Sequence, residues 1–177
     1  MDSQRPRCSV FIATSLDGYI ARPDGGIDWL SIVETPGEDY GFQEFFDSVD
    51  VVLLGRNSYD VVLGFPEWYY PGKRVIVLTH RPTESRHGEE FYTGDVEALV
   101  RQLSESGARR IYVDGGAVIQ QFLKAGLIDD MTISVIPILL GSGIRLFAGG
   151  EPEARLTLSS TQSWPSGLVQ LRYQLAT

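Results

Sequence analysis

The sequence predicts a three-layer α/β sandwich in which a mainly parallel, mixed central sheet ends in an antiparallel C-terminal hairpin. Short apolar, β-branched runs typical of buried strands alternate with segments whose apolar residues recur at helical spacing. After residue 154 only strand-like alternation remains. Alternating strands and helices favour a parallel sheet with helices on its faces, and a closing pair of strands adds an antiparallel edge.

Length and composition are those of a single globular domain over residues 1–177. Hydrophobic residues make up 43% of the chain and charged residues 21%. The net charge of −8 argues against a general nucleic-acid binder, which needs a basic face. With one cysteine, no signal peptide and no run long enough to cross a bilayer, we expect a cytoplasmic protein without a membrane partner.

The first half of the chain contains three predicted strands and two predicted helices. The strands are expected at 8–13, 50–54 and 73–78, and the helices at 41–48 and through 59–63. A long segment, 14–30, follows the first strand and carries two Asp-Gly pairs and Trp29. Its aromatic and aliphatic content argues against disorder, so we expect a working loop there, continued by a polar loop over 31–40.

The second half continues the alternation and then changes to strands. Asp95 is placed to cap a helix over 95–106, and a strand over 110–114 leads into a helix that ends near Leu123. A long strand over 131–140 is expected to be bent, or to lie at an edge, near Pro137. Two alternating runs, 155–162 and 168–175, predict the closing hairpin.

Gly115 and Gly116 join the strand over 110–114 directly to a helix. Backbone N–H groups at a helix N-terminus carry a partial positive charge, and glycine lets a phosphate approach them closely. The same pair of glycines is also compatible with a tight strand-to-helix turn that binds nothing. A second junction of this kind, Gly55 to Ser58, adds Arg56, which suits a phosphate unless it pairs with an acid such as Asp60.

The candidate features gather at one edge of the predicted sheet. In a parallel sheet, ligands collect where the strands end at their carboxyl ends. Both glycine junctions, the loop after the first strand, and Thr79, His80 and Arg81 after the third strand fall at that edge. No cluster of His and Cys has metal-ligand spacing, and neither a nucleophile elbow nor a Walker loop is present. We therefore expect an anion-binding edge and no metal.

Several stretches, in this order, resemble the dihydrofolate reductase-like superfamily. The similarity is greatest to the branch shared with the reductase domain of bacterial riboflavin biosynthesis, here as a stand-alone member. The matching stretches are Ser15-Leu16-Asp17-Gly18-Tyr19-Ile20-Ala21, Ile27-Asp28-Trp29-Leu30, Leu54-Gly55-Arg56-Asn57-Ser58-Tyr59, Asp114-Gly115-Gly116, Pro137-Ile138-Leu139-Leu140-Gly141-Ser142-Gly143 and Leu146-Phe147.

The resemblance implies an NADPH-dependent oxidoreductase that reduces a pteridine, pyrimidine or related heterocycle. Its substrate would be like that of a dihydrofolate reductase or a 5-amino-6-(5-phosphoribosylamino)uracil reductase. The cofactor would be held through residues at four places: Ala13, Gly18 and Ile20; Gly55, Arg56, Asn57 and Ser58; Thr79, His80 and Arg81; and Gly115, Gly116, Ala117 and Val118.

The resemblance also implies the polar residues of the substrate side. Asp17 matches the first-loop acid of riboflavin-type relatives, although an Asp-Gly turn explains it equally well. Trp29 would line the substrate or pin the loop from the core. Glu34 lies at the distance after Trp29 at which folate-reducing relatives place a carboxylate, but residues 32–40 resemble a loop rather than a helix.

Two other functional classes remain compatible with the sequence. A nucleotide-binding or sensing module would keep the cofactor site without turnover, and acids facing the nicotinamide would argue against it. A hydrolase of small substrates would need a nucleophile that the sequence does not reveal. The long apolar C-terminal strands and the aromatic segment 65–70 further predict a homodimer.

Overall fold

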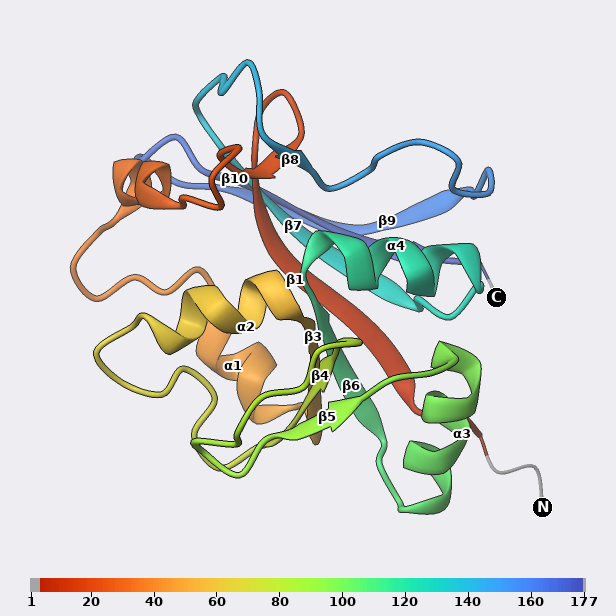
Figure 1. Cartoon of the computed structure of the whole chain (residues 1–177). Helices are drawn as coiled ribbons and strands as arrows, with labels where there is room; N and C mark the ends of the chain where they lie inside the picture. The colour runs from red at the N-terminus through yellow and green to blue at the C-terminus, as the bar shows by residue number, and fades with distance from the viewer. Residues whose placement is uncertain (1–3, 177) are drawn as a thin grey trace.

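The computed structural model describes residues 4–176 and is built on an eight-stranded sheet (Figure 1). The strand order is β5-β4-β3-β6-β1-β7-β10-β9, and a separate short pair joins β2 to β8. The strands are β1 (Arg7–Ser15), β2 (Tyr19–Ala21), β3 (Val51–Gly55), β4 (Arg74–Leu78), β5 (Glu90–Tyr92), β6 (Arg110–Asp114), β7 (Asp130–Ile136), β8 (Ile144–Arg145), β9 (Leu156–Ser163) and β10 (Val169–Leu175).

The first six strands of that order run parallel to one another. Strand β10 pairs antiparallel with β7, and β9 pairs antiparallel with β10. Helices α3 (Val96–Glu105) and α4 (Gly116–Lys124) pack on one face of the sheet, and α1 (Phe42–Asp47) and α2 (Arg56–Leu63) pack on the other (Figure 1). This confirms the predicted three-layer arrangement. The hairpin β9–β10 closes one edge, as the alternation in the sequence predicts.

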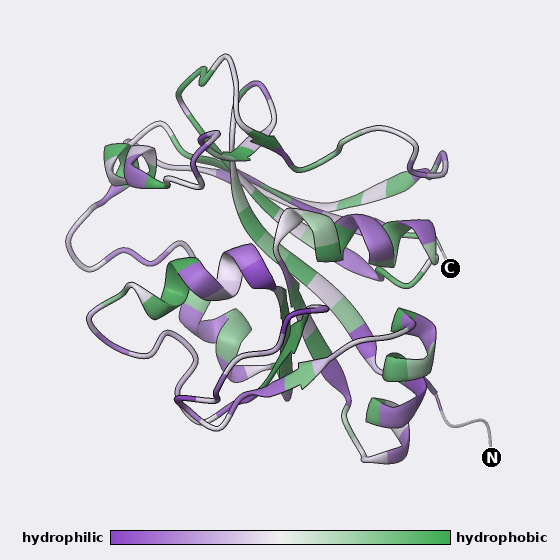
Figure 2. Ribbon diagram, in the orientation of Figure 1, coloured by the Kyte–Doolittle hydropathy of each residue, from purple (hydrophilic) through white to green (hydrophobic). Residues whose placement is uncertain are grey.

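Strand β3 shows why the sheet is covered on both faces. Val51 and Leu53 point into the core with α3 and α4, and Val52 and Leu54 point into the core with α1 and α2. All four side chains are at most 3% exposed. Successive residues of a strand face opposite ways, so an unbroken apolar run indicates a strand buried on both sides. Figure 2 shows these apolar runs through the middle of the sheet.

The structure corrects two expectations about single elements. Strand β7 ends at Ile136, directly before Pro137, and it lies between β1 and β10 rather than at an edge. Proline has no N–H for the ladder, so it ends this central strand instead of bending it. Residues 31–33 of the expected loop over 31–40 belong instead to a short 3₁₀ helix, η1 (Asp28–Val33), which contains the buried Trp29.

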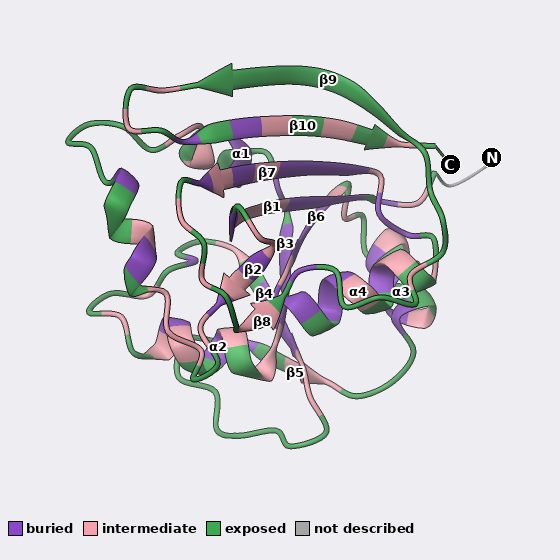
Figure 3. Ribbon diagram, turned by 90° about the horizontal axis from the view of Figure 1, so that it is seen from above, coloured by how far each residue is buried: buried purple, intermediate pink, exposed green. Residues whose placement is uncertain are grey.

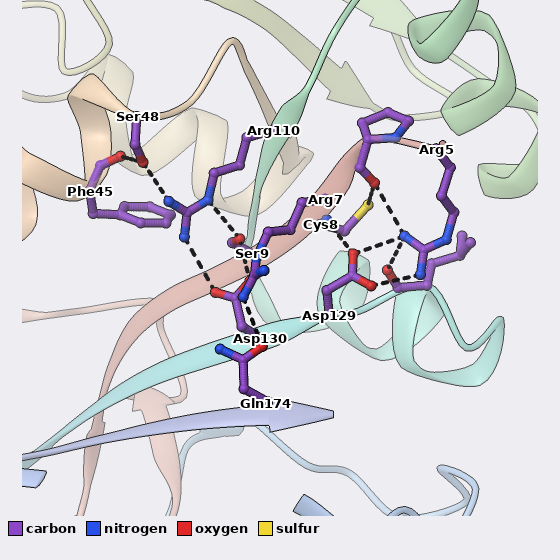
Figure 4. Close-up of polar contacts among 12 residues, drawn as sticks. Arg5, Arg7, Cys8, Ser9, Phe45, Ser48, Arg110, Asp129, Asp130 and Gln174 are labelled. Atoms are coloured by element: carbon purple, nitrogen blue, oxygen red, sulfur yellow. Dashed lines mark hydrogen bonds and ion pairs between the residues drawn. The ribbon is translucent and has the colours of Figure 1, made fainter. Parts of the chain in front are cut away.

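The amino ends of β1 and β6 meet the start of β7 in a network of ion pairs (Figure 4). Asp130, which is 7% exposed, accepts hydrogen bonds from Arg7 Nε at 2.5 Å and from Ser9 Oγ at 2.8 Å, and Arg110 approaches it at 3.4 Å. The neighbouring Asp129 binds Arg5 through both oxygens at 2.9 Å. Cys8 is fully buried beside this network, and burial raises the pKa of its thiol to about 12.

The edge of the sheet formed by β9 is far more exposed than this network. Every residue of β9 is exposed, as Figure 3 shows along the whole strand. Leu156 and Leu158 of this strand are 39% and 51% exposed. Within residues 4–176, no helix has the length and apolar character needed to span a bilayer.

Candidate active site

A cavity of about 1180 Å³ opens at the carboxyl ends of the central strands. Its walls come from four parts of the fold: β1 and the segment after it, the β3–α2 junction, the β6–α4 junction, and the chain from η1 to α1. The predicted anion-binding edge and this cavity coincide. The lining includes the following predicted cofactor residues: Ala13, Ile20, Gly55, Arg56, Asn57, Ser58, Gly115, Gly116, Ala117 and Val118.

Two helix N-termini lie side by side in this cavity. Gly55 caps α2 and Gly115 caps α4, and neither helix has a side-chain hydrogen bond at its cap. The first N–H groups of an uncapped helix lack partners within the helix and carry a partial positive charge. Gly115 Cα lies so close to α2 that a Cβ there would be 2.6 Å from Ser58 Oγ. Both N-termini therefore face one anion-sized space.

Gly115 and Gly116 are required at this junction for two separate reasons. Gly115 has φ +91°, a conformation that side chains disfavour. A Cβ on Gly116 would lie 2.9 Å from Ile20 Cδ1 and 3.3 Å from the Arg145 carbonyl oxygen. Gly115 thus serves the tight turn, and Gly116 allows the close packing of the chain against Ile20 and Arg145.

Arg56 is held at the mouth of this space by two contacts. Its Nε donates to Asp60 at 2.9 Å, and its Nη1 donates to the carbonyl oxygen of Arg81. Arg56 therefore pairs with Asp60 while it lies at the N-terminus of α2. The segment from Thr79 to Arg81 lies behind Arg56 and outside the cavity lining, with Thr79 Oγ1 accepting the Arg81 N–H at 3.1 Å.

Asp114 is a carboxylate of this cavity that the sequence did not single out. Its Oδ2 accepts the hydroxyl of Tyr70 at 2.9 Å, and its Oδ1 accepts the N–H of Gly115 at 2.9 Å. Protein surrounds it on all sides except the cavity, and burial raises the pKa of its carboxyl group. Burial, with the charge of Asp114, also places the pKa of Tyr70 well above its usual value. A neutral carboxyl group here could donate a proton.

The position of Asp114 carried a usable signal. An acid at the last residue of a central parallel strand lies at the edge where ligands bind. It also precedes an anion-binding turn, so its ionised form would be disfavoured beside a bound phosphate. The sequence does not show that Tyr70, from a loop 44 positions away, hydrogen-bonds to Asp114.

Asp17 lies outside the cavity lining and joins two loops. Its carboxylate accepts the Ser15 hydroxyl at 2.6 Å and the N–H groups of Leu140 and Gly141 at 3.1 and 2.8 Å. These bonds, that of Ser15 most of all, hold its pKa below the usual range. Gly18 lies in the same turn with φ +88°. The geometry fits a carboxylate that fastens the loop after β1 to the loop after β7.

Trp29 lies within η1, Glu34 directly follows it, and the two side chains have different surroundings. Trp29 is 2% exposed, donates its Nε1–H to the Gly26 carbonyl oxygen, and packs with Val33, Ile136 and Leu168 in a small core. Glu34 lines the cavity, directly after η1, with an exposed side chain. Of the three residues proposed for the substrate side, Glu34 is thus the one that faces the cavity.

An aromatic wall completes the cavity opposite the helix N-termini. Phe42 stacks on Tyr69 with ring centres 5.5 Å apart and meets Phe11 edge-on at 5.7 Å. Phe65 contacts Tyr69 edge-on at 5.6 Å. These four residues all line the cavity. The segment 65–70, which the sequence suggested for a dimer contact, therefore contributes to the cavity wall.

Comparison with known proteins identifies the family of this chain. The family model of the RibD C-terminal domain matches residues 6–170. The chain belongs to this family. The predicted resemblance to the riboflavin-type branch of the dihydrofolate reductase-like superfamily is thereby confirmed.

Individual relatives agree in fold and leave the activity open. An uncharacterized protein of Bacillus subtilis, YwjB, is 39% identical over 168 residues, which cover 93% of this chain and 95% of that protein. A crystal structure from Shewanella sp. PV-4, provisionally assigned to riboflavin biosynthesis, has a TM-score of 0.90 and 38% identity, covering 97% and 99% of the two chains. Dihydrofolate reductase from Enterococcus faecalis, in complex with NADP(H), shares the fold with a TM-score of 0.67 and 16% identity, covering 97% of each chain.

Proposed function

We propose that this protein is an NADPH-dependent reductase that transfers a hydride to a pteridine, pyrimidine or related heterocycle. The observation that carries the proposal is the pair of uncapped helix N-termini, α2 and α4, that meet across Gly115 in one cavity. Two such N-termini suit the phosphates of a dinucleotide better than a single anion. The RibD-type fold makes reduction the expected chemistry for such a site.

The residues present fit this cofactor. Gly115 and Gly116 carry no side chains that could shield the backbone N–H groups at the N-terminus of α4 from a phosphate. Arg56, Asn57 and Ser58 supply donors at the neighbouring helix, and Arg56 would favour the extra phosphate of NADPH. Thr79, His80 and Arg81 would extend the same binding surface beyond Arg56. Ala13, Gly18 and Ile20 would flank the nicotinamide, which supplies the hydride when NADPH is bound.

The remaining groups would handle the substrate and its proton. A hydride acceptor also needs a proton, and the Asp114 carboxyl group, whose pKa is raised by burial, lines the cavity where it could supply one. Tyr70 would keep that carboxyl oriented through its hydrogen bond to Oδ2. Glu34 would bind donor groups of the heterocycle. Trp29 would act from the core by fixing η1, and Asp17 by fixing the loop after β1.

A binding module without turnover is the alternative, and the cavity argues against it. A sensor needs no acids beside the nicotinamide, whereas Glu34 and Asp114 both line this cavity. Consumption of NADPH in the presence of a panel of oxidised pteridines and pyrimidines would distinguish the two functions. Binding of NADPH without consumption across the panel would favour the sensor.

The deciding experiment is a titration of NADPH and NADH into the protein, followed by calorimetry and by tryptophan fluorescence. We expect saturable binding with a preference for NADPH. The variant Gly116→Val fills the space next to Ile20 and should abolish binding, whereas Ala154→Val, in an exposed loop outside the cavity, should not change it. Absence of binding by either cofactor to the unaltered protein would overturn the proposal.

We also propose a cytoplasmic homodimer, for which β9 is the supporting feature. This edge strand is exposed along its entire length and carries two exposed leucines. Such edges invite pairing with a second chain. Light scattering at micromolar concentration should give the mass of a dimer, and a monomer mass would contradict it.

A further inference from the structure

The charges that line the cavity have a strong bias toward one sign. Within residues 4–176 the lining includes four acidic side chains, Glu34, Glu38, Asp39 and Asp114, and a single cationic one, Arg56. Arg56 lies at the N-terminus of α2, among the proposed cofactor residues, and is already paired with Asp60. The part of the cavity between η1 and α1 therefore presents carboxylates without a cation to balance them.

Two of the three acids of the segment 34–39 are held in place by backbone hydrogen bonds, and the third, Glu34, is not. Glu38 accepts the N–H of Tyr40 at 2.8 Å, and Asp39 accepts the N–H groups of Gly41 and Gln43 at 2.9 Å. These two hydrogen bonds keep the pKa of Asp39 low, so it remains ionised. The Glu34 side chain makes no hydrogen bond or ion pair with any residue from 4 to 176, so its carboxylate is available to a ligand.

Cations close in sequence or space to this region have other partners. Arg22 pairs with Asp28 at 2.7 Å, and Arg145 lies over the ring of Tyr19 and donates to its hydroxyl at 3.1 Å. Arg172, whose Nη2 would lie 3.1 Å from a Cβ on Gly41, donates to Gln170 Oε1 at 3.3 Å. None of these three lines the cavity. In the part of the cavity between η1 and α1, a phosphate or carboxylate on the substrate would therefore face Glu34, Glu38 and Asp39 without a cation in the lining.

Another part of the cavity lining is aromatic: Phe42 contacts Phe11 and Tyr69, and Tyr69 contacts Phe65. Flat, apolar walls favour planar rings that stack or pack edge-on. Below them, Tyr70 and Asp114 supply the polar contacts. Shape and charge thus select the same kind of ligand, a flat ring with hydrogen-bond donors and no negative group.

We propose that the substrate is a planar aromatic heterocycle that carries no phosphate or carboxylate, and is neutral or cationic. This inference rests on the proposed reductase function and narrows it, because a phosphoribosyl substrate would place about two negative charges among these acids. Specificity would come from repulsion of phosphorylated analogues as much as from attraction of the correct ring.

A series of three pterins that differ only in the charge of the 6-substituent tests this directly. The probes are 6-hydroxymethylpterin, 6-carboxypterin and the phosphate monoester of 6-hydroxymethylpterin, which carry zero, one and about two negative charges. Each is titrated into protein saturated with NADP⁺, which prevents turnover, and binding is followed by pterin fluorescence. We expect the Kd to rise by roughly tenfold for each added charge at about 0.01 M salt, and the gap to narrow at about 0.15 M salt, where screening is stronger.

Each outcome has one meaning. Equal or tighter binding of the phosphate ester would overturn the proposal, and so would failure of all three probes to bind protein that does bind NADP⁺. Failure of NADPH and NADP⁺ themselves to bind would instead remove the proposed function, and it is measured first.

A charge-reversal pair locates the effect. The double variant Glu34→Lys/Glu38→Lys should tighten binding of the phosphate ester by about tenfold. The matched control is Glu97→Lys/Glu105→Lys, which makes the same change in net charge on exposed positions of α3, outside the cavity. If the control variant tightens binding equally, the repulsion comes from the net charge of the protein and the assignment to this cavity is wrong.

Discussion

One shielded aspartate lies at each end of the central strands, and the two aspartates differ in their partners. Asp130, at the amino ends of the strands, is surrounded by Arg7, Arg110 and Ser9 (Figure 4). Asp114, at the carboxyl end of β6, has hydroxyl and backbone donors but no cation. The first is compensated inside the protein, and the second is left to be compensated by a proton or a ligand.

This contrast separates a structural acid from a chemical one better than burial alone. A buried carboxylate with arginine partners joins three strands through its ion pairs. A carboxyl group that lacks a cation and opens to a cavity has its pKa raised by burial, which makes it a candidate proton donor for a reaction. Five experiments test how far the contrast extends.

The largest effect is expected at the amino end. Asp130→Ala leaves Arg7 and Arg110 without their shared partner, and we expect a loss of about 3 kcal/mol in the free energy of unfolding. Urea unfolding measures it. The exposed pair of Arg74 and Glu90 is the control, since Glu90→Ala should cost less than about 1 kcal/mol. If the two variants lose the same stability, Asp130 is no more structural than a surface acid.

The second effect concerns Asp114 and is expected in the rate. Asp114→Asn keeps the shape and an acceptor oxygen but has no acidic proton, so kcat should fall about 100-fold while the Kd for NADPH is retained. Asp60→Asn, an exposed change nearby, is the control. Normal turnover by the Asp114 variant would show that the proton comes from elsewhere.

The same variant has an expected pH signature in stability. The pKa of Asp114 is raised in the folded chain, so the folded state keeps a proton that the unfolded state has lost over the intervening pH range. Stability of the unaltered protein therefore falls as the pH rises through that range, which begins near pH 4. Asp114→Asn removes this loss, so its stability relative to the unaltered protein should increase with pH. A constant difference across pH would contradict the raised pKa.

A smaller effect is expected at Arg56, the cation of the carboxyl edge. Arg56→Ala should reduce the preference for NADPH over NADH by about tenfold, because one charge-assisted contact to a phosphate is lost. Paired titrations of both cofactors measure the ratio. Arg101→Ala, at an exposed position of α3, should leave the ratio unchanged. An unchanged ratio in both variants would separate Arg56 from cofactor selection.

The smallest effect is expected at Asp17. Asp17→Asn weakens the bonds to Leu140 and Gly141, and hydrogen exchange at these two amides should become about tenfold faster. If Asp17 instead supplies the proton, the variant would lose kcat as heavily as Asp114→Asn. Comparison of the two variants therefore decides between a fastening role and a chemical one.

The sequence predicted the local features of the fold well. A glycine directly after an apolar run marks both strand-to-helix junctions, and these junctions hold the helix N-termini of the cavity. Strand β7 was misjudged at Pro137, because the sequence does not show that β10 pairs beside it. Strand β5, of three residues, is too short for alternation to reveal.

The substrate side was harder to predict because its chemistry comes from distant segments. Asp114 acquires its character from Tyr70, and the aromatic wall joins residues of β1, α1 and the segment 65–70. Asp17 illustrates the reverse case, since the Asp-Gly turn explains its hydrogen bonds without any ligand. The family resemblance supplied the cofactor hypothesis. The charge of the cavity lining becomes visible only when the distant segments are brought together in the fold.

The state of Cys8 makes the chain convenient for labelling. It is the one cysteine in the sequence, its side chain is fully buried, and its thiolate is disfavoured, so maleimides and oxidants have no ready target in the folded protein. A cysteine introduced at an exposed position, such as Glu38→Cys, would then be the unique reactive thiol. A single fluorophore or spin label could follow the mouth of the cavity during binding, in a chain that needs no other change.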